Sequence, residues 1–449
     1  MKIFTPSNIS APIICQRKTF SLLEILLLLF AAILLAAGSF FVMQQKTSSD
    51  RVTMGYTDPN DYTGTDIEKI NAAIRDAQRK GGVVRIFKRK GDAASKRDYW
   101  LIDSAILLPG ETTLYITNCK IKLSDRARDN WIRSANCMPG KERVEELTGI
   151  HIIGEGNAVL EGADRPRATG DGGKTLGRQT YGTDAGKAGE YPKGDWRNLG
   201  ILLVKVRGFS LRNLKLVNSH SWAISLELCR QGIIRDLNFD STGYITVDGK
   251  QERVLNQDGL DLRRGCRDIA IENITGRTGD DMIALSVFPP GSKRKTGEFG
   301  GTEFLRNVFT LEDCHVFNVA IRNVRGYCVQ GYRVIRLLNN RGAKIHHVQI
   351  TDVVDTSPKD LQQISTLLLG DTNYGGIAPA GDLFAIQISN VISKAKNAVL
   401  IFGPLQDSMI SNVLSSDKKS GAPIRHEKGE KSIGLFFNNV RSQGEVSSN

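Results

Sequence analysis

A short motif recurs along most of this chain and limits the folds that the chain can adopt. The motif reads apolar-x-apolar-x-Asn/Asp-apolar, as in FSLRNL, IAIENI and VAIRNV, and its Asn or Asp falls at 213, 236, 273, 323, 352, 390, 412 and 439. The shortest gaps between these positions, 22, 23 and 27 residues, give the length of one unit. Alternating apolar residues indicate strands and an Asn or Asp favours a bend, so each unit is expected to form one coil.

The unit length distinguishes among repeat architectures. A β-propeller blade needs ~40 to 45 residues, and a βαβ unit or a leucine-rich repeat needs a helix that these units lack. Coils of this size stack at the strand spacing of ~4.8 Å and leave a long sheet face suited to a linear polymer. The predicted fold class is therefore all-β, a single-stranded right-handed parallel β-helix over residues 61–443. Apolar residues at helical spacing in 65–80 predict a short N-terminal capping helix.

An apolar run from Phe20 to Met43 precedes this domain. It is long enough to cross the ~30 Å hydrocarbon core of a bilayer as one transmembrane helix. Arg17 and Lys18 come directly before it, so residues 1–19 are expected in the cytoplasm, 20–43 as an anchor and 44–60 as a linker. The body would then be extracytoplasmic, in the periplasm or at the cell surface. A cleaved signal peptide is the alternative, although the run is longer than the apolar region of a usual signal peptide.

The formal net charge of +12 indicates an anionic partner. A basic surface attracts polyanions of any kind. No helix-turn-helix pattern, zinc-finger spacing or aromatic RNA-binding signature accompanies the charge, so we expect no nucleic-acid partner and favour an acidic polysaccharide. A basic surface without a specific partner is the alternative. We expect the protein to be a monomer.

The cysteine spacings do not match a metal site, and we predict neither a metal nor another cofactor. Six of the seven cysteines follow the apolar run. An even number in an exported domain permits disulfides, with Cys119–Cys137 and Cys314–Cys328 as the closest pairs. Cys229 and Cys266 are equally compatible with small apolar core residues.

Two acidic clusters are the strongest candidates for a catalytic site. They are Asn256-Gln257-Asp258-Gly259-Leu260-Asp261 and Gly279-Asp280-Asp281. Each alone is an ordinary turn sequence. Asp258 and Asp280 are 22 residues apart, about one coil, so stacking should bring their carboxylates to the same face of adjacent coils. Crowded carboxylates raise at least one pKa, which lets a general acid and a general base coexist near neutral pH.

The stretch NQDGLDLRRGCRDIAIENITGRTGDDMIAL resembles the core of glycoside hydrolase family 28, the polygalacturonases and their relatives, within the pectin lyase-like β-helix superfamily. The resemblance implies inverting hydrolysis of a glycosidic bond, with Asp280 as the general acid and with Asp258 and Asp281 activating water. It further implies four residues that bind substrate, namely Asn256, Asp261, Arg333 and Arg336. The family carries a Gly-His-Gly sequence after its paired aspartates, and this chain has none after Asp281. The family also has a lysine at the position that Leu338 occupies here.

Two other functions fit the same residues. One is a polysaccharide lyase in which Asp258, Asp261, Asp280 and Asp281 bind calcium and Arg336 is the base, because oxygen clusters of this kind suit calcium. The other is an adhesin or a glycan-binding solenoid without turnover. We predict an extracytoplasmic glycoside hydrolase that acts on an acidic, pectin-like polysaccharide.

Overall fold

The computed structural model describes residues 55–442, apart from 92–94, 139–143, 171–173, 177–195, 290–292, 295–296, 299–309, 341, 371–376, 417–422 and 428–431. The predicted cytoplasmic segment 1–19 and the predicted anchor 20–43 lie outside the described residues. No helix within the described residues is long and apolar enough to cross a bilayer. Thr57, in the range predicted as a linker, already forms a parallel bridge with Val84.

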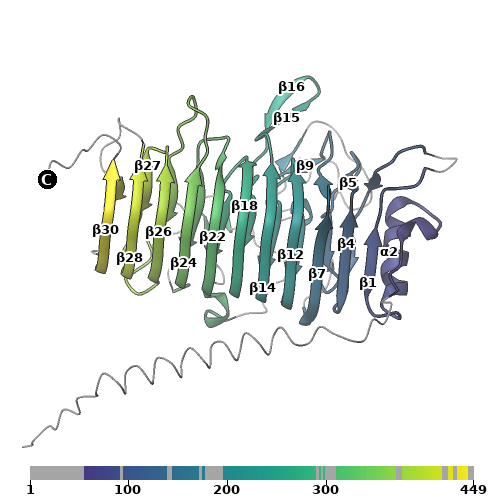
Figure 1. Cartoon of the computed structure of the whole chain (residues 1–449), viewed down its shortest axis with the longest axis horizontal. Helices are drawn as coiled ribbons and strands as arrows, with labels where there is room; N and C mark the ends of the chain where they lie inside the picture. The colour runs from purple at the N-terminus through teal and green to yellow at the C-terminus, as the bar shows by residue number, and fades with distance from the viewer. Residues whose placement is uncertain are drawn as a thin grey trace, which may run out of the picture. The chain divides into compact units, whose positions relative to one another are not determined.

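Two parallel sheets make up most of the described chain. In the first sheet eleven strands follow one another in the row seen in Figure 1: β1 (Val83–Ile86), β4 (Thr112–Thr117), β7 (Leu147–Glu155), β12 (Val206–Val217), β14 (Arg230–Asp240), β18 (Arg267–Thr278), β22 (Val316–Cys328), β24 (Ile345–Asp355), β26 (Leu383–Ser393), β28 (Gln406–Ser415) and β30 (Ile433–Ser442). Three shorter strands pair beside this row: β2 (Trp100–Ile102), β5 (Lys120–Leu123) and β8 (Val159–Glu161). We call this sheet the long-strand sheet.

The second sheet, which we call the short-strand sheet, carries the candidate site. Its order is β3 (Ile106–Leu108), β6 (Ile132–Ser134), β11 (Ile201–Val204), β13 (Ile224–Glu227), β17 (Leu260–Leu262), β19 (Ile283–Val287), β23 (Arg333–Asn339), β25 (Ser365–Leu369), β27 (Asn397–Ile401) and β29 (Ile424–His426). Three two-stranded ribbons project from the coils: β9 (Ala168–Thr169) with β10 (Lys174–Thr175), β15 (Tyr244–Val247) with β16 (Lys250–Arg253), and β20 (Lys293–Arg294) with β21 (Gly297–Glu298). The helices are η1 (Pro59–Asp61), α2 (Asp66–Ala77), η3 (Trp196–Asn198) and η5 (Glu312–Cys314).

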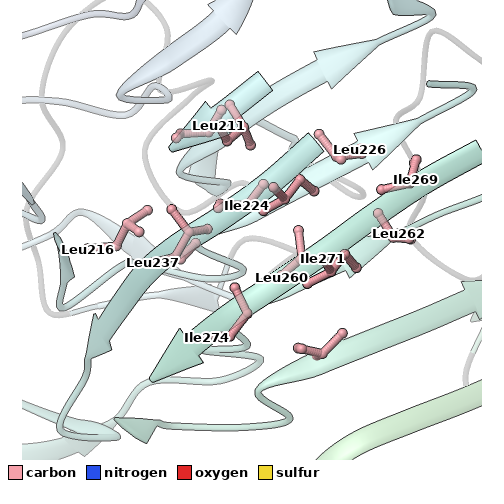
Figure 2. Close-up of a cluster of buried hydrophobic side chains, with 14 of the residues drawn as sticks. Leu211, Leu216, Ile224, Leu226, Leu237, Leu260, Leu262, Ile269, Ile271 and Ile274 are labelled. Carbon is pink, nitrogen blue, oxygen red and sulfur yellow. The ribbon is translucent and has the colours of Figure 1, made fainter. Parts of the chain in front are cut away.

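The pairing register confirms that each sequence repeat is one coil of a parallel β-helix. Leu211 pairs with Ile234, and Ile234 pairs with Ile271, so equivalent apolar positions of successive repeats lie on top of one another. Their side chains point into an interior shared by both sheets, as Figure 2 shows for Leu211, Ile271 and Leu260 among others. Parallel stacking of whole repeats excludes the four-stranded blades of a propeller.

The eight Asn or Asp residues of the motif form a ladder along the long-strand sheet. All eight have a left-handed backbone, with φ between 50° and 60°, which Asn and Asp tolerate better than other residues with a side chain. Side-chain amides join neighbouring coils: Asn273 Nδ2 donates to Asp236 Oδ1 at 2.8 Å and Asn323 Nδ2 to Asn273 Oδ1 at 2.8 Å. Five residues before each ladder position stands a second left-handed residue, at 208, 231, 268, 318, 347, 385, 407 and 434. Each of the eight strands that carry the motif, from β12 to β30, therefore bends twice.

Variants of Asn390 can separate the effect of its left-handed backbone on stability from the effect of its two ladder hydrogen bonds. Its Nδ2 donates to Asp352 Oδ1 at 2.9 Å, and its Oδ1 accepts from Asn412 Nδ2 at 3.1 Å. We expect Asn390→Ala to lower the free energy of unfolding by about 2–3 kcal/mol, because alanine loses both hydrogen bonds and is strained at positive φ. Asn390→Gly should cost only about 1 kcal/mol, since glycine accepts this backbone. Urea unfolding of both variants measures the difference, and equal losses would mean that the backbone conformation contributes nothing.

The capping helix predicted for 65–80 is confirmed as α2, which ends at Ala77. Thr65 and Glu68 form a capping box at its start, with the Thr65 N–H donating to Glu68 Oε2 at 2.8 Å. Ile70 and Ile74 are buried in the same interior as the strands. In Figure 1 the helix lies beside β1, at the N-terminal end of the row, where it covers the first coil. It protects apolar side chains that a bare solenoid end would expose.

The disulfides that the sequence permits do not form. All six described cysteines are free and buried. Cys119 belongs to the interior of the β-helix, whereas Cys137 lies in a separate apolar cluster around Trp196 and Trp222, so the two side chains are packed in different clusters. Cys229 and Cys266 are core residues, as the alternative reading of the sequence expected.

Candidate active site

The three aspartates lie just before two adjacent strands of the short-strand sheet. Asp258 precedes β17, and Asp280 and Asp281 precede β19. One carboxylate oxygen of each lies within 4.8 Å of one from each of the others, so the predicted convergence of these carboxylates is confirmed. The register differs by one residue from the spacing argument: Leu260 pairs with Ile283, which places Asp258 beside Asp281 rather than beside Asp280. The Gly259 N–H donates to the Asp281 carbonyl at 3.0 Å in the same ladder.

A buried glutamine that the sequence reasoning missed holds the acidic turns together. The Gln257 side chain donates to the Ser219 carbonyl at 2.7 Å and accepts from the Gly243 N–H at 2.9 Å. Its backbone carbonyl accepts from the N–H groups of Gly279 and Asp280 at 3.0 and 3.1 Å. Gln257 thus connects three consecutive coils, and its position inside the acidic motif was its only signal in the sequence.

Two arginines form ion pairs with Asp281. Arg333 Nη1 donates to Asp281 Oδ1 at 3.0 Å, and Arg336 Nη1 donates to Asp281 Oδ2 at 3.3 Å. The Asp281 side chain is fully buried and those of the two arginines nearly so, so charge-assisted hydrogen bonds replace water around this carboxylate. The sequence reasoning expected both arginines to bind substrate; the structure brings their guanidinium groups onto Asp281.

The pKa values of Asp258 and Asp280 are both raised. Burial raises the pKa of Asp258 well above its ordinary value, and the charges of Asp261, Asp280 and Asp281 raise it further. Burial, followed by the charge of Asp281, raises the pKa of Asp280 to about 7, against the opposing effect of Arg336 and Arg333. Asp280 can therefore exchange a proton near neutral pH, which is the condition that acid–base catalysis requires.

The other predicted residues lie close to this group. Asp261 points outward from β17, is almost fully buried, and pairs in register with Ser225 and Ala284. Asn256 has a left-handed backbone with φ of 50°, and its carbonyl accepts a hydrogen bond from Ser221 Oγ at 3.4 Å. Both residues therefore lie on the coil that carries Asp258.

Several residues near the site carried no signal in the sequence. The Ala223 N–H donates to the Asp258 carbonyl at 2.9 Å, which places the preceding Trp222 beside this coil. The Arg263 guanidinium lies 4.4 Å above the Trp222 ring. His346 and His347 lie away from this site, on the long-strand sheet, where His346 stacks between Phe317 and Phe384.

The calcium-lyase alternative finds little support in this geometry. Three carboxylates within reach of one another could hold a cation. Arg333 and Arg336 already neutralise Asp281, however, and a calcium ion held there would lie close to both of these cations. Arg336 donates a hydrogen bond to a buried carboxylate, so it is a protonated cation here rather than a base.

The raised pKa of Asp280 should make the stability of the folded chain depend on pH, and this can be tested without a substrate. Its pKa is 3.8 ordinarily and about 7 in the folded chain, so the contribution of this group to stability is lost as pH rises between these values. Asparagine cannot ionise. We therefore expect Asp280→Asn to have about the stability of the unmodified chain near pH 4 and to exceed it by on the order of a few kcal/mol near pH 8.

Urea unfolding at both pH values tests this expectation. Asp98→Asn is the matched control, because Asp98 is exposed and its hydrogen bond and charge contact with Lys88 lower its pKa, so that variant should gain nothing as pH rises. A gain for Asp280→Asn that is the same at both pH values would contradict a high pKa.

No family model and no curated protein matches this chain in sequence. Among solved structures, the polygalacturonase from Erwinia carotovora ssp. carotovora is similar with a TM-score of 0.51 at 14% identity, over 89% of this chain and 99% of that chain. The endo-xylogalacturonan hydrolase from Aspergillus tubingensis gives 0.51 at 13% identity, over 86% and 92%. A surface adhesin of Streptococcus pneumoniae gives 0.45 at 11% identity, over 86% and 98%. At these identities the likeness to the two hydrolases shows the fold alone: this chain is a parallel β-helix protein.

Proposed function

We propose that this chain is a glycoside hydrolase acting on an acidic, pectin-like polysaccharide, with the chemistry of glycoside hydrolase family 28. The observation that carries the proposal is the acidic group itself. Asp258, Asp280 and Asp281 bring oxygens within 4.8 Å of one another, and two arginines form ion pairs with one of the three. Paired carboxyl groups with different protonation states are the usual catalytic apparatus for hydrolysing a glycosidic bond.

In the proposed reaction Asp280 is the general acid. Its proton passes to the leaving glycosidic oxygen as the bond from that oxygen to the anomeric carbon breaks. A water molecule attacks the same carbon and gives its proton to the ionised form of Asp258, which the raised pKa of this group makes a stronger base. The negative charge of Asp281, held by Arg333 and Arg336, would stabilise the positive charge that develops on the sugar ring.

The proposal includes inversion of the anomeric configuration. The carboxyl groups of inverting enzymes are usually ~6.5–9.5 Å apart, so oxygens within 4.8 Å would require the water to lie beside the carboxylates rather than between them. Proton NMR of the first product formed distinguishes the two anomers. A product that retains the configuration would instead assign a nucleophile to this group.

The charge around the acids supports an anionic substrate. Arg333 and Arg336 supply two cations to this site, and the whole chain carries a formal charge of +12. Arginine matches the planar geometry of a carboxylate and is suited to uronic acid units. A non-catalytic glycan-binding protein would use the same charges, so turnover has to be measured directly.

A panel of polysaccharides tests the proposed function. The purified chain would be incubated with neutral, uronate-containing and rhamnogalacturonan polymers, and new reducing ends would be measured together with absorbance in the near ultraviolet. Hydrolysis produces reducing ends without unsaturated products, whereas a lyase produces both. Binding without either signal on every polymer would replace the hydrolase with the adhesin-like function.

We also propose that residues 20–43 anchor the protein in a membrane with the β-helix outside the cytoplasm, on the evidence of the apolar run and of Arg17 and Lys18 before it. We further propose that the β-helix winds in a right-handed sense, because crossover connections between parallel strands are nearly always right-handed. We also propose that the protein is a monomer. Protease treatment of spheroplasts should degrade the body, and its protection would contradict export.

A further inference from the structure

The β15–β16 hairpin is inserted directly before the acidic motif. Tyr244 pairs with Arg253 at its base, and its tip is Asp248-Gly249, both with positive φ, which is typical of a tight two-residue hairpin turn. In Figure 1 the hairpin stands clear of the row of strands. Arg253 is the last residue of β16, so the hairpin ends only five residues before Asp258.

The base of the hairpin lies against the turn that carries Asp280. The Val254 N–H donates to the Gly243 carbonyl at 3.0 Å and closes the base. A Cβ added to Gly279 would lie 3.0 Å from the Gly243 Cα, so the base and this turn are in close contact. Gln330, which precedes β23, donates to the carbonyls of Gly243 and Val254 at 2.9 and 3.2 Å. These contacts join the base of the hairpin to the turn of Asp280 and to the next coil, which carries Gln330.

Arg253 is held beside the charged group of the site. Its Nε donates to Gln330 Oε1 and its Nη2 donates to the Tyr332 hydroxyl. The Tyr332 ring lies 5.3 Å from the Arg253 guanidinium and 5.5 Å from that of Arg333, which binds Asp281. These two hydrogen bonds use two of the five N–H donors of a guanidinium, and Arg253 is partly exposed. The Arg253 guanidinium is therefore held in place by these contacts and can still donate further hydrogen bonds to a ligand.

The balance of charge at this place favours an anion. Arg253, Arg333 and Arg336 contribute three positive charges. Burial and neighbouring charges raise the pKa of both Asp258 and Asp280, which reduces their negative charge relative to ordinary aspartates, and the negative charge of Asp281 is already shared by two arginines. An anionic group that enters here meets an excess of cations in partly buried surroundings, where charge interactions are strong.

We propose that the hairpin forms one wall of the substrate site and that Arg253 binds the carboxylate of a sugar unit lying against the hairpin. This sugar unit would adjoin the glycosidic bond whose oxygen Asp280 would protonate. The inference rests on the proposed function for the position of the scissile bond. The choice of a carboxylate rests on the hydrogen-bonding geometry and the charge around Arg253. Arg253 is thus a specificity residue and the hairpin is its support.

The test measures binding and turnover separately with the full chain. Sodium polygalacturonate and the same polymer with its carboxyl groups reduced to alcohols are the two probes. Three variants are compared: Arg253→Gln, Arg253→Lys, and Lys250→Gln as a control that removes the same charge from the exposed far end of β16. Binding is followed by isothermal titration, turnover by reducing ends, and folding by thermal unfolding.

We expect Arg253→Gln to bind polygalacturonate about 10- to 100-fold more weakly, because hydrogen bonds between charged groups are worth that much, and to bind the reduced polymer unchanged. Arg253→Lys should recover part of the loss, since it keeps the charge without the planar fork, and it also serves if the glutamine variant fails to fold. Lys250→Gln should change neither affinity more than about twofold.

The outcomes separate this inference from the proposed function. Charge-selective loss of binding without any hydrolysis by the unmodified chain would support Arg253 as the carboxylate-binding residue and reject the hydrolase. An equal loss for both polymers, an unchanged affinity, or no binding of polygalacturonate by the unmodified chain would overturn the inference. A rise in KM with kcat within about threefold is expected if both proposals hold.

Discussion

Asp280→Asn is expected to lower kcat on the natural polymer by about 10²–10⁴-fold while it leaves the Kd for the polymer within about threefold. The amide keeps the shape of the carboxyl group but has no proton to give to the leaving oxygen. Asp280 can fill this role because burial beside Asp281 raises its pKa to about 7, so the group is protonated where a free carboxyl group is not. Single-turnover kinetics and titration binding measure the two quantities.

A substrate with an activated leaving group makes this prediction specific. A nitrophenyl or fluoride leaving group needs little protonation, so Asp280→Asn should lose far less activity on such a glycoside than on the polymer. Asp258→Asn should lose activity on both substrates, because activation of water is needed in each case. If the two variants respond alike to the leaving group, the roles of Asp280 and Asp258 are not those proposed.

The double substitution Arg333→Met with Arg336→Met is expected to lower the free energy of unfolding by about 3–5 kcal/mol. Asp281 is fully buried and hydrogen-bonds to both guanidinium groups, so the double variant leaves a buried carboxylate without its cations. Methionine fills similar space without charge, which limits the cavity contribution. Urea unfolding at neutral pH gives the value.

Two further variants show whether charge is the cause. Adding Asp281→Asn to the double variant removes the unpaired carboxylate and should recover at least about half of the lost stability. Arg322→Met is the surface control: Arg322 pairs with Glu272 at 3.5 Å and both side chains are substantially exposed, so about 0.5 kcal/mol or less is expected. A triple variant as unstable as the double variant would mean that packing by the arginines matters more than charge.

The parts of the fold that repeat could be predicted because their causes are local. Each motif carries its own alternation and its own Asn or Asp at a left-handed bend, so eight copies report the same coil independently. The spacing between Asp258 and Asp280 was a weaker guide. It found the right pair of coils, yet the register aligns Asp258 with Asp281, because the offset between β17 and β19 is set by the strands and not by the turns before them.

The charged surroundings of the acids could not be read from one sequence. Arg253 meets Gln330 and Tyr332, which follow it by 77 and 79 residues, and no periodicity connects positions so far apart. Arg333 and Arg336 were expected to bind substrate, but their bonds to Asp281 depend on which outward side chains come together on two adjacent coils. Such contacts arise from stacking, and a local motif does not contain them.

The constant five-residue interval between the two left-handed columns constrains how a protein of this kind can change in evolution. One residue gained or lost within that interval would turn every following side chain of the strand to the opposite face, so interior residues would meet water. The corner before the short strands has no such constraint, and it has accommodated a complete hairpin before Asp258. Insertions and deletions can therefore reshape the walls around the acids in different lineages while the floor beneath them keeps its geometry, which separates the evolution of specificity from that of the scaffold.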